Sequence, residues 1–438
     1  MKIKNLTINL YKSIKDKMRL EFSDVNTFIG QNNCGKSSIL NAIQIALCPE
    51  LDNTYVFYHK SDVELNIEFS DKEKREFNFP ENNAILKLEV NKRTLVFKNI
   101  EIDYLKYVEK FSKKIKKLNE ESFLDIKSIE KDFKSIFNYS ENLKLFQNAL
   151  KKHFPKITAN EEALDPHFEH VGLYEGSRRA TIDHLGSGFI RVFTILLYIY
   201  HPQYHIVLID EPENHLHPAL IKNLLNAIQN SSLTQVFFTT HTSLFISAKT
   251  IPNLVRVVRD EKSTRAYDYT GAKFNKERLS EEMNSDNMEM FFADKVLIVE
   301  GISDRLLFRG LINRFYKGDK DIKVVQTYGK GNAIVYSDLL KIFNIPFIMV
   351  FDRDMLKGGY LESLTSRLNL NINLRDVAQL KQNGIFIFPN GVLEDNYPRK
   401  YQRNDSKALS ALYAANLITE SDFNSSKMKN IREIISML

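Results

Sequence analysis

One eight-residue pattern constrains the fold of this 438-residue chain more than any other: Gly30-Gln31-Asn32-Asn33-Cys34-Gly35-Lys36-Ser37 fits GxxxxGK[ST]. It follows a predicted strand at Val25 to Ile29 and opens an apolar helical pattern at Ser38 to Leu47, which is the strand–loop–helix context that such a loop needs. The glycines let backbone N–H groups and the helix N-terminus surround a phosphate. Lys36 would reach the β- and γ-phosphates, and the Ser37 hydroxyl would bind Mg²⁺. The pattern predicts an α/β nucleotide-binding domain that binds ATP, with contacts from Gly30, Asn33, Gly35, Lys36, Ser37 and Ser38.

A continuous apolar run later in the chain ends in two acidic residues. Residues His205 to Ile209 are typical of a buried parallel strand, and Asp210 and Glu211 follow directly. Asp210 would help to hold Mg²⁺, and Glu211 could orient and deprotonate the attacking water. Such a pair is weak evidence by itself, but it gains weight because it follows a phosphate-binding loop.

A carboxylate cluster is predicted in the second half of the chain. Lys295 to Val299 and Phe347 to Phe351 are apolar strand patterns, followed by Glu300 and by Asp352-Arg353-Asp354, respectively. Parallel strands place their carboxyl ends on one edge of a sheet, so these side chains should converge. Three carboxylates so close together repel one another unless a cation holds them, and hard oxygen ligands favour Mg²⁺ or Mn²⁺.

The domain organisation follows from where these patterns lie. We expect an ATPase domain at residues 1–100 and 165–270, a helical insertion at 101–164, a second α/β domain at 288–400 and a polar helical tail at 401–438. The insertion is either a plain surface subdomain or an arm for dimerisation or DNA contact. The polar stretch from Thr270 to Asn287 is predicted to be a linker.

Composition limits the cellular setting. The chain has no run of 18 apolar residues and no apolar signal segment, so no membrane association is expected. It has two cysteines, which predicts a reducing cytoplasm rather than a disulfide framework. The net charge of +6, from 61 basic and 55 acidic residues, is compatible with nucleic acid but is not evidence for it.

The first domain resembles the ABC-type ATPases in the order of its motifs. Leu185-Gly186-Ser187-Gly188 stands where the signature loop is found, Pro212 to Pro218 resembles the D-loop, and His241 ends a strand as the switch histidine does. The resemblance implies that Ser187 and Gly188 cap the γ-phosphate of a partner subunit's ATP and that His241 contacts this phosphate. The glutamine that usually closes the signature is absent, with Phe189 and Ile190 in its place.

The second domain resembles Toprim domains of topoisomerases, primases and some nucleases. Val299-Glu300-Gly301 with Asp304, the turn Tyr328 to Asn332, the DxD at Asp352 and Asp354, and Leu393-Glu394-Asp395 follow in the expected order. The resemblance implies phosphodiester hydrolysis, with Glu300, Asp352 and Asp354 as metal ligands. Asp304 and Glu394 would complete a second metal site, and either Lys330 or Lys400 would be the lysine near the metals.

An ABC-type head followed by a Toprim domain is similar to the architecture of the overcoming lysogenization defect nucleases. The resemblance implies a DNA-cutting enzyme, gated by nucleotide or a partner, that forms a homodimer or higher oligomer through its heads. It also implies a role in anti-phage defence, in which the partner could be a reverse transcriptase with its RNA–DNA, or a helicase. Two alternatives stay open: a recombination-type repair ATPase with a structural Toprim domain, and a nucleotide-dependent sensor without nuclease activity.

Overall fold

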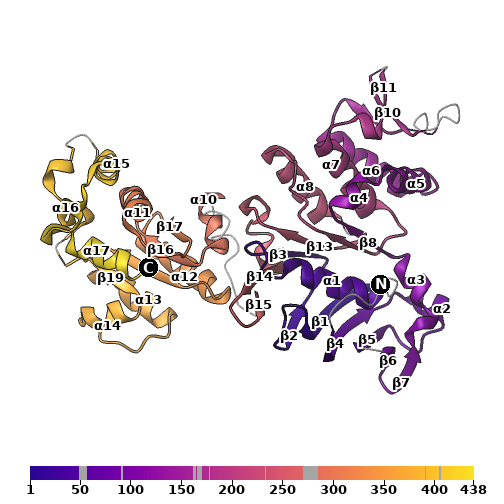
Figure 1. The fold of residues 1–438 in the computed structure, drawn as a ribbon, viewed down its shortest axis with the longest axis horizontal. Coiled ribbons are helices and arrows are strands. Elements are labelled where there is room, and N and C mark those ends of the chain that lie inside the picture. The colour runs from indigo at the N-terminus through magenta and orange to yellow at the C-terminus, as the bar shows by residue number, and fades with distance from the viewer. Residues whose placement is uncertain are drawn as a thin grey trace. The chain divides into compact units, whose positions relative to one another are not determined.

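The structure is a computed structural model that describes residues 1–48, 57–89, 92–160, 164, 170–176, 178–231, 233–269, 285–389, 391–403 and 406–438. It divides into two compact α/β units (Figure 1). Unit 1 comprises Met1–Phe245 and Thr250–Asp268, and unit 2 comprises Ile246–Lys249 and Tyr269–Leu438. The α/β fold class predicted from the sequence is confirmed in both units.

Unit 1 is built on two six-stranded sheets. The first is antiparallel, in the order β2-β1-β4-β5-β6-β7, and the second has the order β15-β14-β3-β13-β12-β8. In the second sheet β14, β3, β13, β12 and β8 run parallel, and β15 pairs antiparallel to β14. The strands are β1 (Lys2–Tyr11), β2 (Met18–Glu21), β3 (Val25–Ile29), β4 (Phe57–Glu68), β5 (Asn83–Glu89), β6 (Lys92–Phe97), β7 (Ile100–Asp103), β8 (Ile115–Leu118), β12 (Ile206–Ile209), β13 (Gln235–Thr240), β14 (Leu254–Arg259) and β15 (Thr264–Asp268).

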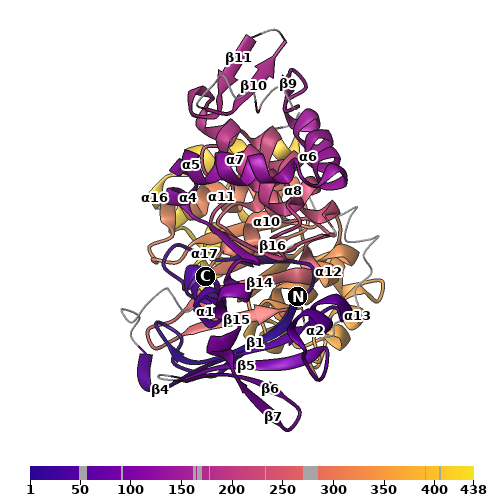
Figure 2. The same cartoon turned by 90° about the vertical axis from the view of Figure 1, so that its right-hand side faces the viewer.

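Apolar side chains on both faces of the second sheet create two hydrophobic cores. In β12, Ile206 and Leu208 pack into the core shared with the first sheet and α1 (Lys36–Leu47), whereas Val207 and Ile209 pack into the opposite core. A strand buried on both faces is continuously apolar, as the β12 sequence is. Helices cover the second core: α4 (Glu120–Leu124), α5 (Ile126–Ile136), α6 (Ser140–His153), α7 (Ser187–Tyr200) and α8 (Pro218–Asn230) (Figure 2).

The predicted helical insertion at 101–164 is not wholly helical. Helix α3 (Val108–Ser112) is followed by β8, which lies at the edge of the second sheet and pairs in parallel with β12. Two of its four residues, Lys116 and Lys117, are lysines, which suit an edge strand and conceal the alternation that a strand normally shows. Beyond α6, β9 (Ile157–Thr158), β10 (Gly172–Glu175) and β11 (Arg178–Thr181) form a small antiparallel sheet. The first sheet also carries α2 (Asp71–Phe77).

Unit 2 contains a four-stranded parallel sheet in the order β17-β16-β18-β19. Its strands are β16 (Lys295–Val299), β17 (Ile322–Gln326), β18 (Phe347–Phe351) and β19 (Ile385–Ile387), and its helices before residue 401 are α10 (Ser285–Met288), α11 (Ile302–Phe315), α12 (Ala333–Ile342), α13 (Tyr360–Arg367) and α14 (Val377–Gln382). Of the predicted linker from Thr270 to Asn287, residues 270–284 lie outside the described residues.

The C-terminal segment is more than the polar tail that the sequence predicted. Helices α15 (Lys407–Leu417), α16 (Glu420–Phe423) and α17 (Lys429–Ser436) each bury apolar side chains in the core of unit 2. Ala411 and Ala414 lie in the same core as Leu307 and Leu311 of α11. The segment is amphipathic: its polar residues dominate the composition, while its small and branched apolar residues complete the domain core.

Gly310 lets α11 and α15 approach closely, because a Cβ atom at this position would lie 2.5 Å from the Cβ of Ala415. We expect Gly310→Val to destabilise the packing of α15 by about 1–3 kcal/mol, since a branched side chain must push the two helices apart. Hydrogen exchange of α15 amides, followed by mass spectrometry, measures this loss directly. Arg309→Val, at an exposed position of the same helix, controls for helix propensity. Equal protection of α15 in the two variants would contradict the expectation.

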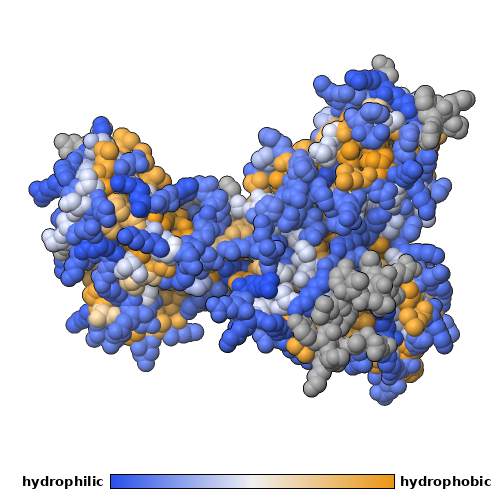
Figure 3. Space-filling view, in the orientation of Figure 1, coloured by the Kyte–Doolittle hydropathy of each residue, from blue (hydrophilic) through white to orange (hydrophobic). Residues whose placement is uncertain are grey.

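The visible face of both units is mainly hydrophilic, with smaller areas where apolar residues reach the surface (Figure 3). Exposed apolar side chains include Leu124 in unit 1 and Leu409 in unit 2. Among the described residues, no helix combines the length and apolar character that crossing a membrane requires.

Candidate functional site

The phosphate-binding loop has the backbone geometry that its glycines permit. Gly30 and Gly35 have φ angles of 151° and 108°, and Asn33 has a φ of 61°. A Cβ atom at Gly30 would lie 2.2 Å from the carbonyl oxygen of Val257, so only glycine fits there. The Lys36 ammonium donates hydrogen bonds to the Gly30 and Gln31 carbonyl oxygens at 2.9 and 3.0 Å. Lys36 and Ser37 begin α1, and Ser38 donates its backbone N–H to Gly35.

The predicted magnesium ligands of unit 1 lie together. The Ser37 hydroxyl is 3.2 Å from the Asp210 carboxylate, to which Thr239 also donates a hydrogen bond. Asp210 follows β12, Thr239 belongs to β13, and Ser37 follows the loop after β3. These strands are neighbours in one parallel sheet, which explains why segments so distant in sequence meet at the same edge.

Glu211 and His241 also meet, and a residue that the sequence analysis missed supports them. The Nδ1 atom of His241 lies 3.6 Å from a Glu211 carboxylate oxygen and 3.3 Å from Glu213. Glu213 is buried, and it accepts hydrogen bonds from the Thr240 hydroxyl at 2.6 Å and the His241 N–H at 2.9 Å. Burial raises the pKa of Glu213, opposed by these hydrogen bonds. In the sequence, the one hint that Glu213 supports His241 was its position in the D-loop-like segment from Pro212 to Pro218.

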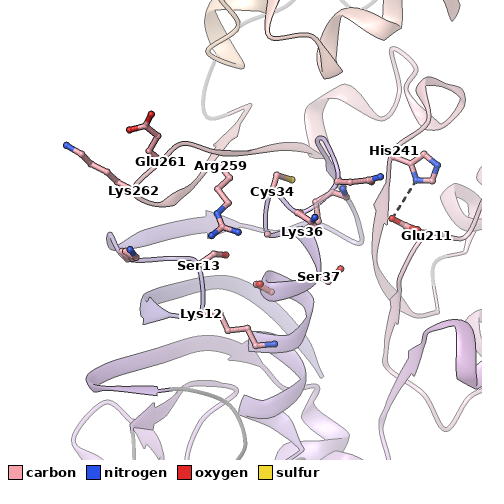
Figure 4. Close-up of a pocket in the computed structure, with 15 residues that line it drawn as sticks. Lys12, Ser13, Cys34, Lys36, Ser37, Glu211, His241, Arg259, Glu261 and Lys262 are labelled. Atoms are coloured by element: carbon pink, nitrogen blue, oxygen red, sulfur yellow. Dashed lines mark ion pairs between the residues drawn. The ribbon is translucent and has the colours of Figure 1, made fainter. Parts of the chain in front are cut away.

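An open pocket of about 950 Å³ surrounds the phosphate-binding loop (Figure 4). Besides the loop, Glu211 and His241, its walls include cationic side chains of two further segments, one after β1 and one at the β14–β15 turn. Sequence reasoning did not single out these residues, because nothing in the linear pattern connects them with the loop. They are Lys12, Lys15, Arg259 and Lys262.

The signature-like residues lie at the start of α7. Ser187 is exposed, and Gly188 packs against the D-loop-like segment, where a Cβ atom would lie 3.0 Å from the carbonyl oxygen of His215. Among the described residues that line the phosphate pocket, neither Ser187 nor Gly188 occurs. Within one chain these two residues therefore do not contribute to that pocket.

In unit 2 the predicted carboxylates converge at one edge of the sheet. Glu300 follows β16 and Asp352 follows β18, and these two strands pair in parallel. Asp352 accepts a hydrogen bond from the Leu393 N–H at 3.1 Å, which brings the Glu394 segment to the same edge. Asp304, in the first turn of α11, accepts one from the Gly301 N–H at 2.9 Å.

The pKa values of these carboxyl groups reflect their burial and their mutual repulsion. Burial raises the pKa of Glu300, and the Asp354 and Asp352 charges raise it further, against the opposing effect of Lys330. Burial, with the charges of Asp354 and Glu394, also raises the pKa of Asp352. Burial, with the charges of Asp352, Glu300 and Glu394, raises the pKa of Asp304 to about 7. The five carboxylates thus share one electrostatic site.

This site fits a divalent cation in the chemistry of its donors. All candidate donors are carboxylate oxygens, and the Oε2 atom of Glu300 is buried without a hydrogen-bond partner among the described residues. A hard cation would satisfy that oxygen and relieve the repulsion. Within the described ranges, however, no three His, Cys, Asp or Glu side chains are already arranged as ligands of one ion. Side-chain rotation would therefore have to accompany binding.

The two candidate lysines differ in position. The Lys330 ammonium lies 2.5 Å from Asp354, and its charge acts on Glu300. Lys400 instead pairs with Asp422 at 2.8 Å and lies over the Tyr401 ring. Of the two, Lys330 is the one that the fold brings to the carboxylates.

Comparison with known families agrees with this two-unit organisation. Residues 64–247 match a family described as "AAA domain, putative AbiEii toxin, Type IV TA system". Residues 291–354 match "Overcoming lysogenization defect protein-like, TOPRIM domain". Residues 1–79 match a family described as "Protein of unknown function (DUF2813)".

Three curated proteins are similar to parts of the chain. The OLD nuclease of Thermus scotoductus is 29% identical over 34% of this chain and 31% of its own length, and the Old nuclease of Escherichia phage P2 is 27% identical over 35% and 28%. Endonuclease GajA of Bacillus cereus is 23% identical over 45% and 36%. The chain thus spans about a third of the length of the curated relatives it matches.

Solved structures of SMC heads are also similar. The SMC head domain from Thermotoga maritima matches with a TM-score of 0.43 and 16% identity, covering 61% of this chain and 99% of that one. An SmcHead bound to the C-winged helix domain of ScpA matches with a TM-score of 0.46 and 16% identity, covering 61% and 97%. The chain thus matches an AAA domain and an OLD-like TOPRIM domain in this order, and parts of it are similar to OLD nucleases, which supports the resemblance to the overcoming lysogenization defect nucleases.

Proposed function

We propose that this protein is a DNA endonuclease that depends on Mg²⁺ or Mn²⁺ and is regulated by ATP bound to its ABC-type domain. The observation that carries the proposal is the convergence of Glu300, Asp352 and Asp354 in one electrostatic site, with Asp304 and Glu394 beside them. Two of the proteins to which parts of the chain are similar are named nucleases.

In this proposal Glu300, Asp352 and Asp354 are catalytic and hold metal, and Asp304 and Glu394 complete a second site. Bound metal would activate water and stabilise charge on the leaving oxygen. Glu300, half-buried, places its unpartnered Oε2 at the site, and Asp352 is oriented by the Leu393 N–H. Lys330 would exchange its Asp354 contact for the phosphate of the substrate, because an ammonium group stabilises developing negative charge.

The same proposal assigns ATP to the unit 1 pocket. Gly30, Asn33, Gly35, Lys36 and Ser38 would surround the phosphates, and Ser37 and Asp210 would hold Mg²⁺ between them. Glu211 would take a proton from the attacking water, and His241, held by Glu213, would contact the γ-phosphate. Ser187 and Gly188, which lie outside this pocket in their own chain, would reach the ATP of a second copy. The working assembly would therefore be a homodimer or a higher homo-oligomer through the heads.

Anti-phage defence in the cytoplasm is the setting that we propose. There, nucleotide state or a partner such as a reverse transcriptase with its RNA–DNA, or a helicase, would gate cleavage of DNA. Two alternatives make different demands. A recombination-type repair ATPase needs no working carboxylate site, and a sensor without nuclease activity needs neither that site nor Glu211. The shared electrostatics of the carboxylates favour the nuclease.

A plasmid assay tests the nuclease proposal. Wild type, Lys330→Ala and Lys400→Ala are incubated with supercoiled DNA and Mg²⁺ or Mn²⁺, with and without ATP. We expect wild type to nick or cut only when divalent metal is present, and Lys330→Ala to be slower by about a hundredfold, the scale of removing one charge-stabilising group. Lys400→Ala, which removes a lysine paired with Asp422 outside the carboxylate site, should behave like wild type.

Three outcomes would change the assignment. Cleavage in the presence of a chelator would rule out the metal-dependent mechanism. Full activity of Lys330→Ala would remove this lysine from the proposal. Intact DNA under every condition, even after addition of the products of neighbouring genes, would favour the sensor or the repair ATPase over the nuclease.

A further inference from the structure

One arginine of α7 is buried although the proposed mechanism does not use it. Arg191 lies one turn after Gly188, and its side chain is 2% exposed. It is among the largest fully buried side chains in the described residues. A guanidinium group is always charged, so burying it is unfavourable unless polar partners and aromatic contacts replace its water. Its partners therefore indicate what it does.

The hydrogen-bond partners of Arg191 are the main chain of Glu211, the proposed catalytic base, and the carboxylate of Glu120. The Nη1 atom of Arg191 donates a hydrogen bond to the carbonyl oxygen of Glu211 at 3.1 Å. The Nη2 atom donates a hydrogen bond to the Glu120 carboxylate, and the guanidinium carbon lies 4.1 Å from the centre of the Phe123 ring. The planar fork of arginine can make these contacts at once, which a lysine cannot.

The Glu211 backbone is the part of the site that most needs such support. Glu211 has a φ of 50°, a left-handed conformation that non-glycine residues rarely adopt and that surrounding contacts must maintain. Its N–H donates to the Thr239 hydroxyl at 3.1 Å, and its carbonyl oxygen accepts from Arg191. The N–H and the carbonyl group of Glu211 are thus both hydrogen-bonded, and these two contacts fix the backbone that directs the Glu211 carboxylate.

The same network reaches the signature-like loop. Glu120 lies at the start of α4, directly after β8, and its second oxygen is 3.4 Å from the Nε2 atom of His215. His215 also has a left-handed backbone, with a φ of 62°, and its carbonyl oxygen packs against Gly188. The first turns of α7 therefore contact the segment from Glu211 to His215 at both of its ends, through Arg191 and through Gly188.

We infer that Arg191 is a positioning residue for ATP hydrolysis: it holds the Glu211 main chain and makes the orientation of that carboxylate depend on where α7 lies. The inference rests on the proposed function, in which Glu211 is the base and Gly188 binds the nucleotide of a second copy. A nucleotide that draws the start of α7 toward itself would then reorient Glu211 in the same chain. Binding at one pocket of the dimer would be linked to hydrolysis at the other.

The test separates positioning from simple stability. Steady-state ATP hydrolysis, equilibrium binding of a fluorescent ATP analogue and thermal unfolding are measured for wild type, Arg191→Lys, Glu120→Gln, Glu211→Gln and Thr194→Val. Arg191→Lys keeps the charge but loses the fork, and Glu120→Gln alters a side chain that is 54% exposed, so it should not unfold the domain. Thr194→Val is the matched control, because Thr194 is fully buried on the same helix.

We expect Arg191→Lys to lower kcat by about ten- to a hundredfold while nucleotide affinity stays within about threefold, as a misplaced catalytic group predicts. Glu120→Gln should lower kcat less, and Thr194→Val should match wild type. The inference would be overturned, with the proposed ATPase mechanism left intact, if folded Arg191→Lys had the kcat of wild type. It would also be overturned if Arg191→Lys and Thr194→Val lost kcat and Tm equally. Absence of hydrolysis in wild type, or normal hydrolysis by Glu211→Gln, would instead overturn the proposed ATPase mechanism, and this inference with it.

Discussion

Replacing Asp352 with asparagine is expected to reduce plasmid cleavage by about a hundredfold or more, while the protein stays folded. Asparagine retains an oxygen that can accept the hydrogen bond from the Leu393 N–H, now 3.1 Å from Asp352. It loses the negative charge, and with it a ligand of the kind that Mg²⁺ prefers. Cleavage should therefore fail because metal is held poorly, which calorimetric titration with Mn²⁺ would detect as weakened binding.

The matched control is Asp338→Asn, which removes one carboxylate charge from the same unit. Asp338 belongs to α12 and pairs with Arg367 at 2.8 Å, outside the carboxylate site. We expect it to cleave and to bind Mn²⁺ like wild type. If Asp352→Asn instead cleaved as fast as Asp338→Asn, the carboxylate edge would not be the nuclease centre, and the nuclease proposal would lose the observation that carries it.

The second large effect is expected at Glu211. Glu211→Gln should slow ATP turnover by about a hundredfold or more, because glutamine cannot accept a proton from water. ATP binding should persist, since the phosphates are assigned to the loop around Lys36, and glutamine retains an oxygen for the hydrogen bond from Asn214. Phosphate release measures turnover, and a fluorescent ATP analogue measures affinity.

Two further variants separate a loss of ATP binding from a loss of ATP turnover. Lys36→Ala should lose binding itself, because it removes the buried ammonium group at the phosphate loop. Glu261→Gln alters another carboxylate that lines the same pocket and should keep both binding and turnover. Turnover at the wild-type rate in Glu211→Gln, together with loss in Lys36→Ala, would mean that another group acts as the base. The Glu211→Gln protein should also retain bound ATP, so the plasmid assay with it would reveal whether ATP promotes or restrains cleavage.

Much of both sites could be predicted because strand ends carry the chemistry. Asp210 and His241 follow neighbouring parallel strands, and Glu300 and Asp352 do the same in unit 2. Continuous apolar runs mark such strands, and the polar residue that ends a run necessarily lies at the sheet edge. An apolar run followed by a polar residue therefore predicts where that residue lies in the folded domain, and the sequence alone is enough to locate it.

Hydrophobic periodicity in the sequence fails to identify elements that are short or that bury small residues. Strand β8 is four residues long and half lysine, so it looked like part of a helical stretch until its pairing with β12 placed it in the sheet. The C-terminal helices looked like a polar tail because α15 buries small residues such as Ala411 and Ala414, and α16 and α17 are only four and eight residues long. Short elements have too few residues for periodicity to identify them.

The sequence by itself thus determined the α/β class, and it located the phosphate loop, Glu300 and Asp352 because each of these three directly follows a buried strand. Only the tertiary structure distinguished Lys330 from Lys400, brought Glu213 behind His241, and joined Arg191 to the Glu211 backbone. The physical reason is that long side chains and buried partners act across elements that are distant along the chain. Their contacts depend on how those elements pack, and no local spacing records that packing.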